Sequence, residues 1–161
     1  MHWIENIVKK LIKSCKTNDP YEIAAQKNIN VIKWNLHHEI MGFYKYIRRN
    51  KFIFINSNLD ETIQRFVCAH ELGHSQLHPR LNTPFLKQNT FFSVDRIEVE
   101  ANYFAVNLLL SNEDFQYYET KHQVLMENGI PLEMEKYINF FRIFIGKYIH
   151  IFLNFHSLYG L

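Results

Sequence analysis

The sequence predicts an α+β fold in which a small, three-stranded, largely antiparallel sheet packs with helices. The hydrophobic period is helical over residues 3–15, changes to two over residues 31–55 and is helical again from residue 60. The composition, 47% hydrophobic and 16% aromatic, is typical of a packed core and not of a disordered chain. A chain of 161 residues suffices for one domain, and no linker or repeat divides it, so we expect a single domain over residues 1–161.

Two helices are predicted before the sheet. Residues 3–15 place apolar side chains on one face and lysines on the other, as an amphipathic helix does. Residues 17–20 predict a turn and helix cap, because Pro20 suits the first position of a helix, and residues 21–26 form a short second helix.

Three strands are predicted from β-branched and aromatic residues with a period of two, at residues 31–36, 42–47 and 51–55. Residues 48–50 form a charged, solvated hairpin turn between the second and third strands. Residues 56–58 end the sheet and lead into the next helix.

That helix carries the pattern H-E-x-x-H in His70-Glu71-Leu72-Gly73-His74. We expect it to begin after Asp60, a suitable N-cap, and to end near Pro79. Residues four apart share one face of a helix, so both imidazoles can reach one metal ion. Glu71 then stands beside the ion, where a general base would be needed.

The pattern alone leaves an alternative open, in which both histidines are ordinary helix residues satisfied by hydrogen bonds. With this composition the pentapeptide arises by chance in roughly 4% of such chains. A zinc site also needs a third protein ligand.

The third ligand is expected on a second long helix, residues 96–110, which Ser93 or Asp95 can cap. An irregular connection, residues 80–93, precedes this helix. The helix carries Glu98 and Glu100.

We favour Glu98 over Glu100, because its face bears small residues that let two helices approach closely. The neighbours of Glu98 on that face are Ala101, Asn102 and Ala105, whereas those of Glu100 are Tyr103, Phe104 and Asn107. Asn102 can also hydrogen-bond a ligating imidazole. The alternative is that both glutamates belong to a solvated helix face.

His78, eight residues after His70, is a rival third ligand. Each four-residue step drifts about 40° around a helix, and Pro79 ends the helix there. We therefore expect His78 to have a capping or core role.

Composition excludes several other functions. A net charge of +2 does not indicate a nucleic-acid-binding surface. No run of about 20 apolar residues indicates a membrane span, and no signal peptide is recognisable. Cys15 and Cys68 form no C-x-x-C motif, which favours reduced, buried thiols and a cytoplasmic location.

Residues 115–161 are helical in period, with a break at residues 128–131. Apolar residues recur there at helical spacing: Ile138, Phe141, Ile145, Tyr148, Phe152 and Phe155. We interpret this seam as a last helix that closes the core, with a partner-docking or dimer face as the alternative.

Taken together, these motifs resemble the ImmA/IrrE zinc metallopeptidases over roughly residues 17–110. The matching segments are Phe54–Asn56, Leu59–Glu61, Gln64–Phe66, Ala69–His74 with Leu77-His78, and Glu98–Ala105. The resemblance implies a gluzincin-type fold in which His70, His74 and the glutamate of the second helix hold zinc and Glu71 is catalytic. In gluzincins a small residue and Asp or Asn follow the ligand glutamate by three and four positions, which fits Glu98.

The resemblance also implies a substrate, because such proteins typically cleave a helix-turn-helix repressor of a phage or mobile element. We therefore predict a zinc-dependent endopeptidase that acts on a DNA-binding repressor. The alternative is a non-catalytic, zinc-containing anti-repressor that only binds the repressor. Glu71 argues against that alternative, because a purely structural zinc site does not need it.

Overall fold

The computed structural model describes residues 1–80, 84–86 and 95–138. Its elements are, in order, α1 (His2–Cys15), α2 (Pro20–Gln26), β1 (Ile29–Trp34), β2 (Ile40–Ile47), β3 (Asn50–Asn56), α3 (Glu61–Leu77), β4 (Pro84–Leu86), α5 (Arg96–Leu109), the 3-10 helix η1 (Phe115–Tyr117), α6 (Lys121–Glu127) and the 3-10 helix η2 (Leu132–Tyr137). The predicted α+β class is confirmed. All three predicted strands are present.

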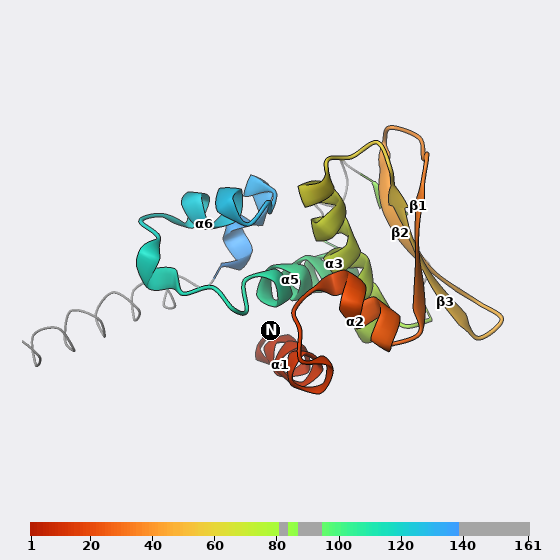
Figure 1. Ribbon diagram of the computed structural model, residues 1–161, viewed down its shortest axis with the longest axis horizontal. Coiled ribbons are helices and arrows are strands. Elements are labelled where there is room, and N and C mark those ends of the chain that lie inside the picture. The colour runs from red at the N-terminus through yellow and green to blue at the C-terminus, as the bar shows by residue number, and fades with distance from the viewer. Residues whose placement is uncertain (81–83, 87–94, 139–161) are drawn as a thin grey trace, which may run out of the picture.

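The sheet has four strands in the order β1-β3-β2-β4 (Figure 1). β2 and β3 form an antiparallel hairpin, and the last strand of this hairpin lies beside β1 and parallel to it. The two turn residues, Arg48 and Arg49, have φ values of 47° and 69°. Positive φ at both positions matches the twist of the flanking strands.

β4 corrects one expectation, because it lies within residues 80–93, which the sequence predicts to be irregular. It pairs antiparallel with β2, with an irregularity between Ile40 and Gly42. A strand of three residues is too short to show a period of two, and it begins with Pro84, a residue confined to sheet edges and strand starts.

Helices α2 and α3 cover one face of the sheet (Figure 1). The buried side chains of Ile53 and Ile55 on β3 and of Phe66 and Val67 on α3 belong to the resulting core. Gly42 on β2 permits the close approach of α3, because a Cβ at this position would lie 2.6 Å from Val67 Cγ1. The sheet thus provides a rigid base for α3.

The caps of the helices agree with their sequence signals. Asp19 accepts hydrogen bonds from the backbone N–H groups of Tyr21 and Glu22, both at 2.9 Å, with Pro20 as the first helical residue of α2. Asp95 caps α5. Asp60 precedes α3 as predicted, although its side chain makes no capping hydrogen bond among the described residues.

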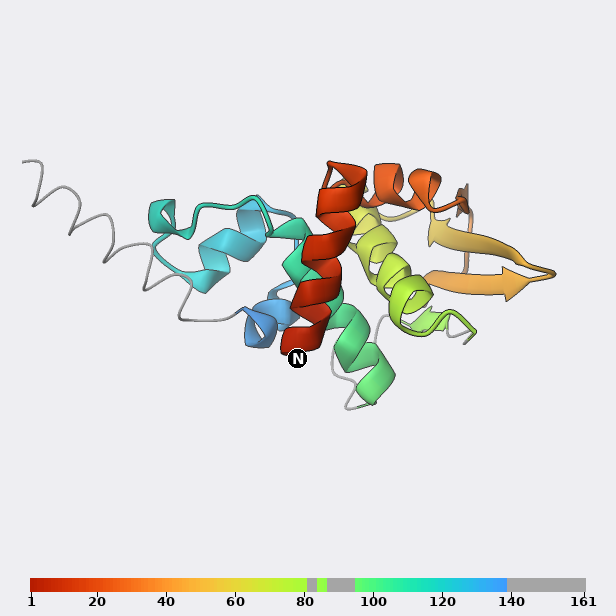
Figure 2. The same ribbon diagram turned by 90° about the horizontal axis from the view of Figure 1, so that it is seen from below.

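α5 packs against α3, and α1 packs against α5 (Figure 2). No helix among the described residues is long and apolar enough to cross a membrane. Beyond Ile138, which is buried, the predicted C-terminal seam lies outside the described residues.

Candidate metal centre

The two histidines of α3 lie on one face of the helix and are both buried. Their spacing of four residues brings the Nε2 atoms of His70 and His74 to 2.9 Å from each other. The rings meet edge to face, with an angle of 79° between their planes. Two nitrogen donors therefore converge on one point.

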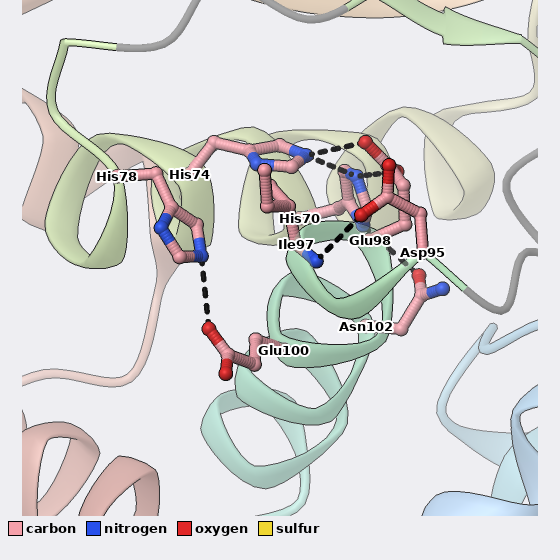
Figure 3. Close-up of polar contacts among 8 residues, drawn as sticks. All are labelled: His70, His74, His78, Asp95, Ile97, Glu98, Glu100 and Asn102. Atoms are coloured by element: carbon pink, nitrogen blue, oxygen red, sulfur yellow. Dashed lines mark hydrogen bonds and ion pairs between the residues drawn. The ribbon is translucent and has the colours of Figure 1, made fainter.

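Glu98, in the first turn of α5, completes this cluster (Figure 3). Its Oε2 and Oε1 atoms lie 3.3 Å from the Nε2 atoms of His70 and His74, respectively. The side chain of Glu98 is 13% exposed, whereas those of His70 and His74 are 0% and 1% exposed. One ligand atom from each of the three residues lies within 4.8 Å of the others.

Small residues bring the two helices close enough for this contact. A Cβ at Gly73 would lie 3.1 Å from Phe104 Cδ1 and 3.3 Å from both Cα and O of Ala101. Gly73 on α3 therefore packs directly on the α5 backbone at Ala101. A larger residue at either position would move Glu98 away from the imidazoles.

The geometry of the cluster fits a metal ion. Donors about 2.0–2.1 Å from a tetrahedral centre lie roughly 3.3 Å apart. Both distances from Glu98 to an imidazole equal 3.3 Å, and the distance between the imidazoles is slightly shorter. Glu98 Oε2 has no hydrogen-bond partner among the described residues, which leaves it available as a ligand.

Asn102 orients one of the imidazoles, as the sequence suggests. Its Oδ1 lies 2.9 Å from His70 Nδ1. An amide oxygen only accepts hydrogen bonds, so Nδ1 carries the proton and Nε2 presents its lone pair to the cluster.

Protonation states in the cluster also suit a cation. Burial lowers the pKa of His70 to about 4, so the imidazole is neutral at neutral pH. Burial alone would raise the pKa of Glu98, but its contacts with the His70 and His74 imidazoles outweigh burial and hold the pKa below its usual range. Neutral imidazoles and an ionised carboxylate are the forms that bind metal ions.

Glu71 lies in the turn between the two histidines and is fully buried. Burial raises its pKa well above the usual range, and the negative charge of Glu98 raises it further, whereas the backbone of Tyr44 partly lowers it. Neither carboxylate oxygen has a hydrogen-bond partner of good geometry among the described residues. A buried carboxyl with so few hydrogen bonds beside a metal cluster can exchange protons with a substrate or water.

The two rival ligands lie outside the cluster and contact each other. His78 Nε2 is 3.0 Å from Glu100 Oε2 (Figure 3). The alternative of a solvated helix face therefore does not hold for Glu100, which is buried. His78, for which a capping or core role is expected, is the C-cap residue of α3, but its pairing with Glu100 was not predicted. Only the Arg96–Glu100 pair, with helical i,i+4 spacing, could have been read from the sequence.

Comparison with known proteins gives consistent results. A family model for peptidases, described as the IrrE N-terminal-like domain, matches residues 24–140. Immunity region protein 2 of Bacillus phage phi105 is 58% identical over 135 residues, which cover 81% of this chain and 85% of that protein. Metallopeptidase ImmA of Bacillus subtilis (strain 168) is 34% identical over 136 residues, which cover 80% of this chain and 79% of that protein.

Proposed function

The chain belongs to the metallopeptidase family of the IrrE N-terminal-like domain, and we propose that it is a zinc-dependent endopeptidase that cleaves a DNA-binding repressor. One observation carries the proposal. His70, His74 and Glu98 converge from two helices, with the buried carboxyl of Glu71 in the turn between the two histidines.

The donor set favours zinc among the common metal ions. Two imidazole nitrogens and one carboxylate oxygen form a three-ligand set that leaves a fourth position open, which is typical of catalytic zinc. Calcium and magnesium prefer sites made of oxygen ligands.

In the proposed mechanism, Glu71 is the general base. Its carboxylate takes a proton from the attacking water and delivers it to the nitrogen of the leaving amine. A raised pKa suits a group that must both accept and release a proton near neutral pH. Zinc, when bound, supplies a Lewis acid that polarises the scissile carbonyl and lowers the pKa of water.

The other residues of the site hold the ligand groups in position. Asn102 holds the His70 ring through Nδ1, so that Nε2 faces the cluster. Contact with both imidazoles keeps the carboxyl group of Glu98 negatively charged. The contact of Gly73 with Ala101 fixes the separation of the two helices that carry these groups.

The proposed substrate rests on the family and on the similar proteins. The ImmA/IrrE resemblance implies a helix-turn-helix repressor, and a similar protein of phage phi105 belongs to an immunity region. A net charge of +2 gives no reason to expect direct contact with the DNA itself.

The test combines metal content with cleavage. Protein purified without chelator should contain about one zinc per chain, because the site has three converging ligands. Incubation with a candidate helix-turn-helix repressor should yield two fragments, identified by mass spectrometry, and a zinc chelator should abolish the reaction. His74→Ala should lose both metal and cleavage, whereas His37→Ala, at an exposed position, should lose neither.

Other results would contradict the proposal. A folded protein without metal would overturn the zinc site. A protein that binds zinc and the repressor but never cleaves it would instead be the non-catalytic anti-repressor.

A further inference from the structure

A second group of polar side chains joins the same two helices beside the metal cluster. The carboxylate of Glu100 lies between the His78 imidazole and the Arg96 guanidinium, with Oε2 at 3.0 Å from His78 Nε2 and Oε1 at 2.7 Å from Arg96 Nε. His78 is the C-cap residue of α3, and both Arg96 and Glu100 belong to the first turns of α5. This group therefore connects the end of one ligand-bearing helix with the start of the other.

Burial makes His78 the more important of the two partners. The side chains of Glu100 and His78 are 8% and 17% exposed, whereas that of Arg96 is 83% exposed. A buried carboxylate is costly without a partner, and an exposed ion pair is weak because water screens it. The contact of Glu100 with His78 is thus the less exposed of the two, and it joins α5 to the end of α3.

The position of this contact determines what it controls. Residues two apart on a helix point in directions roughly 160° apart, so Glu98 and Glu100 leave α5 on different sides. Figure 3 shows Glu98 on one side of His74, and the His78–Glu100 pair on the other. Glu98 contacts His70 and His74, while Glu100 contacts α3 one turn further on.

Two kinds of contact determine how α5 lies against α3. The packing of Gly73 on Ala101 sets the distance between the helices, and Asn102 contacts His70 near the same crossing point. The contact at His78 lies one turn further along α3, and it opposes rotation of α5 about its own axis. The direction of Glu98 is fixed as a result.

We propose that the His78–Glu100 pair is a positioning bridge that holds Glu98 at the metal site. This inference rests on the proposed zinc site, and it assigns neither residue as a ligand. Without the bridge, α5 can rotate and Glu98 no longer faces both imidazoles. Loss of such supporting contacts typically weakens metal binding by about 10- to 100-fold.

The test measures zinc affinity and metal geometry in matched variants. Glu100→Ala and His78→Ala remove the bridge, and His78→Gln restores an N–H donor that can reach Glu100. Tyr103→Phe is the control, because it removes a hydrogen bond between α5 and Glu5 of α1, away from the cluster. Zinc affinity is measured by competition with a chromophoric chelator, and ligand geometry by the visible absorption of the Co²⁺-substituted protein.

We expect both alanine variants to bind zinc about 10- to 100-fold more weakly and to show an altered Co²⁺ spectrum. His78→Gln should stay within about threefold of the unchanged protein, as should Tyr103→Phe. Should an alanine variant fail to fold, Glu100→Gln decides instead, because it keeps the side-chain shape and removes the charge. It should bind zinc about tenfold more weakly.

Equal affinity and an identical Co²⁺ spectrum in the variants without the bridge would overturn the inference, while the zinc site itself stands. Weak binding in the Tyr103→Phe control would overturn it as well, because any change in α5 would then have the same effect. Absence of zinc binding in the unchanged protein would overturn both the bridge and the proposed function.

Discussion

Replacing Glu71 by glutamine is expected to abolish peptide cleavage while making the metal-free protein more stable. The two effects have one cause. Glu71 is fully buried, and neither of its carboxylate oxygens has a hydrogen-bond partner of good geometry among the described residues. A group left unpaired in this way can carry protons, but it opposes folding.

The size of the stability change follows from that burial. Leaving a buried polar or charged group unsatisfied costs about 1–3 kcal/mol. Glutamine has nearly the same shape and leaves a polar group unpaired as well, but it cannot ionise. Near pH 8 the variant should therefore gain the free energy of unfolding that a buried, ionised Glu71 costs, about 1–3 kcal/mol. For a chain of this size the gain corresponds to a rise in Tm of about 2–4 °C per kcal/mol.

The pH dependence gives the sign of the stability change independently of its size. Burial, with the charge of Glu98, raises the folded-state pKa of Glu71 above its ordinary value of 4.5. A raised pKa favours the protonated form in the folded state, so stability is complete below pH 4.5 and falls as pH rises through the raised pKa. The advantage of Glu71→Gln should therefore be smallest near pH 4.5 and grow toward about pH 8.

The assay is urea unfolding of chelator-treated protein across this pH range. Glu61→Gln is the matched control, because Glu61 lies in the first turn of the same helix and is exposed. It should change stability by less than about 0.5 kcal/mol, at every pH. Zinc content and repressor cleavage are measured on the same preparations, and Glu71→Gln should bind zinc and leave the repressor intact.

Two results would refute this reasoning. A Glu71→Gln variant that is less stable than the unchanged protein near pH 8 would mean that the carboxylate is ionised and well solvated or paired. A variant that still cleaves the repressor at a similar rate would show that Glu71 is not the base.

Three further predictions concern the surroundings of Glu71. Asn102→Ala should weaken zinc binding about 10- to 100-fold in chelator competition, because His70 loses its orienting acceptor, whereas Asn107→Ala should not. Gly73→Ala should lower the free energy of unfolding by about 1–3 kcal/mol in urea, despite the better helix propensity of alanine, because its Cβ would press on Phe104 at 3.1 Å. Acid should destabilise the metal-free protein through His70, whose pKa is lowered from 6.5 to about 4 in the folded state. About 3 kcal/mol of the free energy of unfolding should be lost as pH falls through that interval, and His70→Gln should remove this loss.

Local signals allowed most of the fold to be predicted. Pro20, Asp19 and Asp95 mark helix starts because capping involves only neighbouring residues. The hairpin between β2 and β3 is likewise local. The parallel pairing of β1 with β3 is a contact between distant segments, and β4 is too short for a pattern, so the sequence indicated neither.

The distinction between local signals and contacts of distant residues also applies to the metal site. His70 and His74 come from one helix, so their spacing alone predicts that they converge. Glu98 could be preferred because small residues follow it on its face, which is a local signal for close packing. The pairing of Glu100 with His78 joins residues 22 positions apart and depends on the rotation of α5 against α3. The sequence shows that Glu100 is present, but it does not show that Glu100 contacts His78.

The cluster also implies that metal binding and folding are coupled. Without metal, the crossing of α3 and α5 buries His70, His74 and Glu71 against the nearby carboxylate of Glu98. Burial lowers the pKa of His70, so this group opposes folding at acid pH. Burial raises the pKa of Glu71, so this group opposes folding at alkaline pH. A ligand that binds only the folded state adds stability as RT ln(1 + [L]/Kd), about 4 kcal/mol at a free concentration of 1,000 Kd. Zinc should therefore shift Tm upward in proportion to the logarithm of its free concentration, and this shift should vanish in His74→Ala.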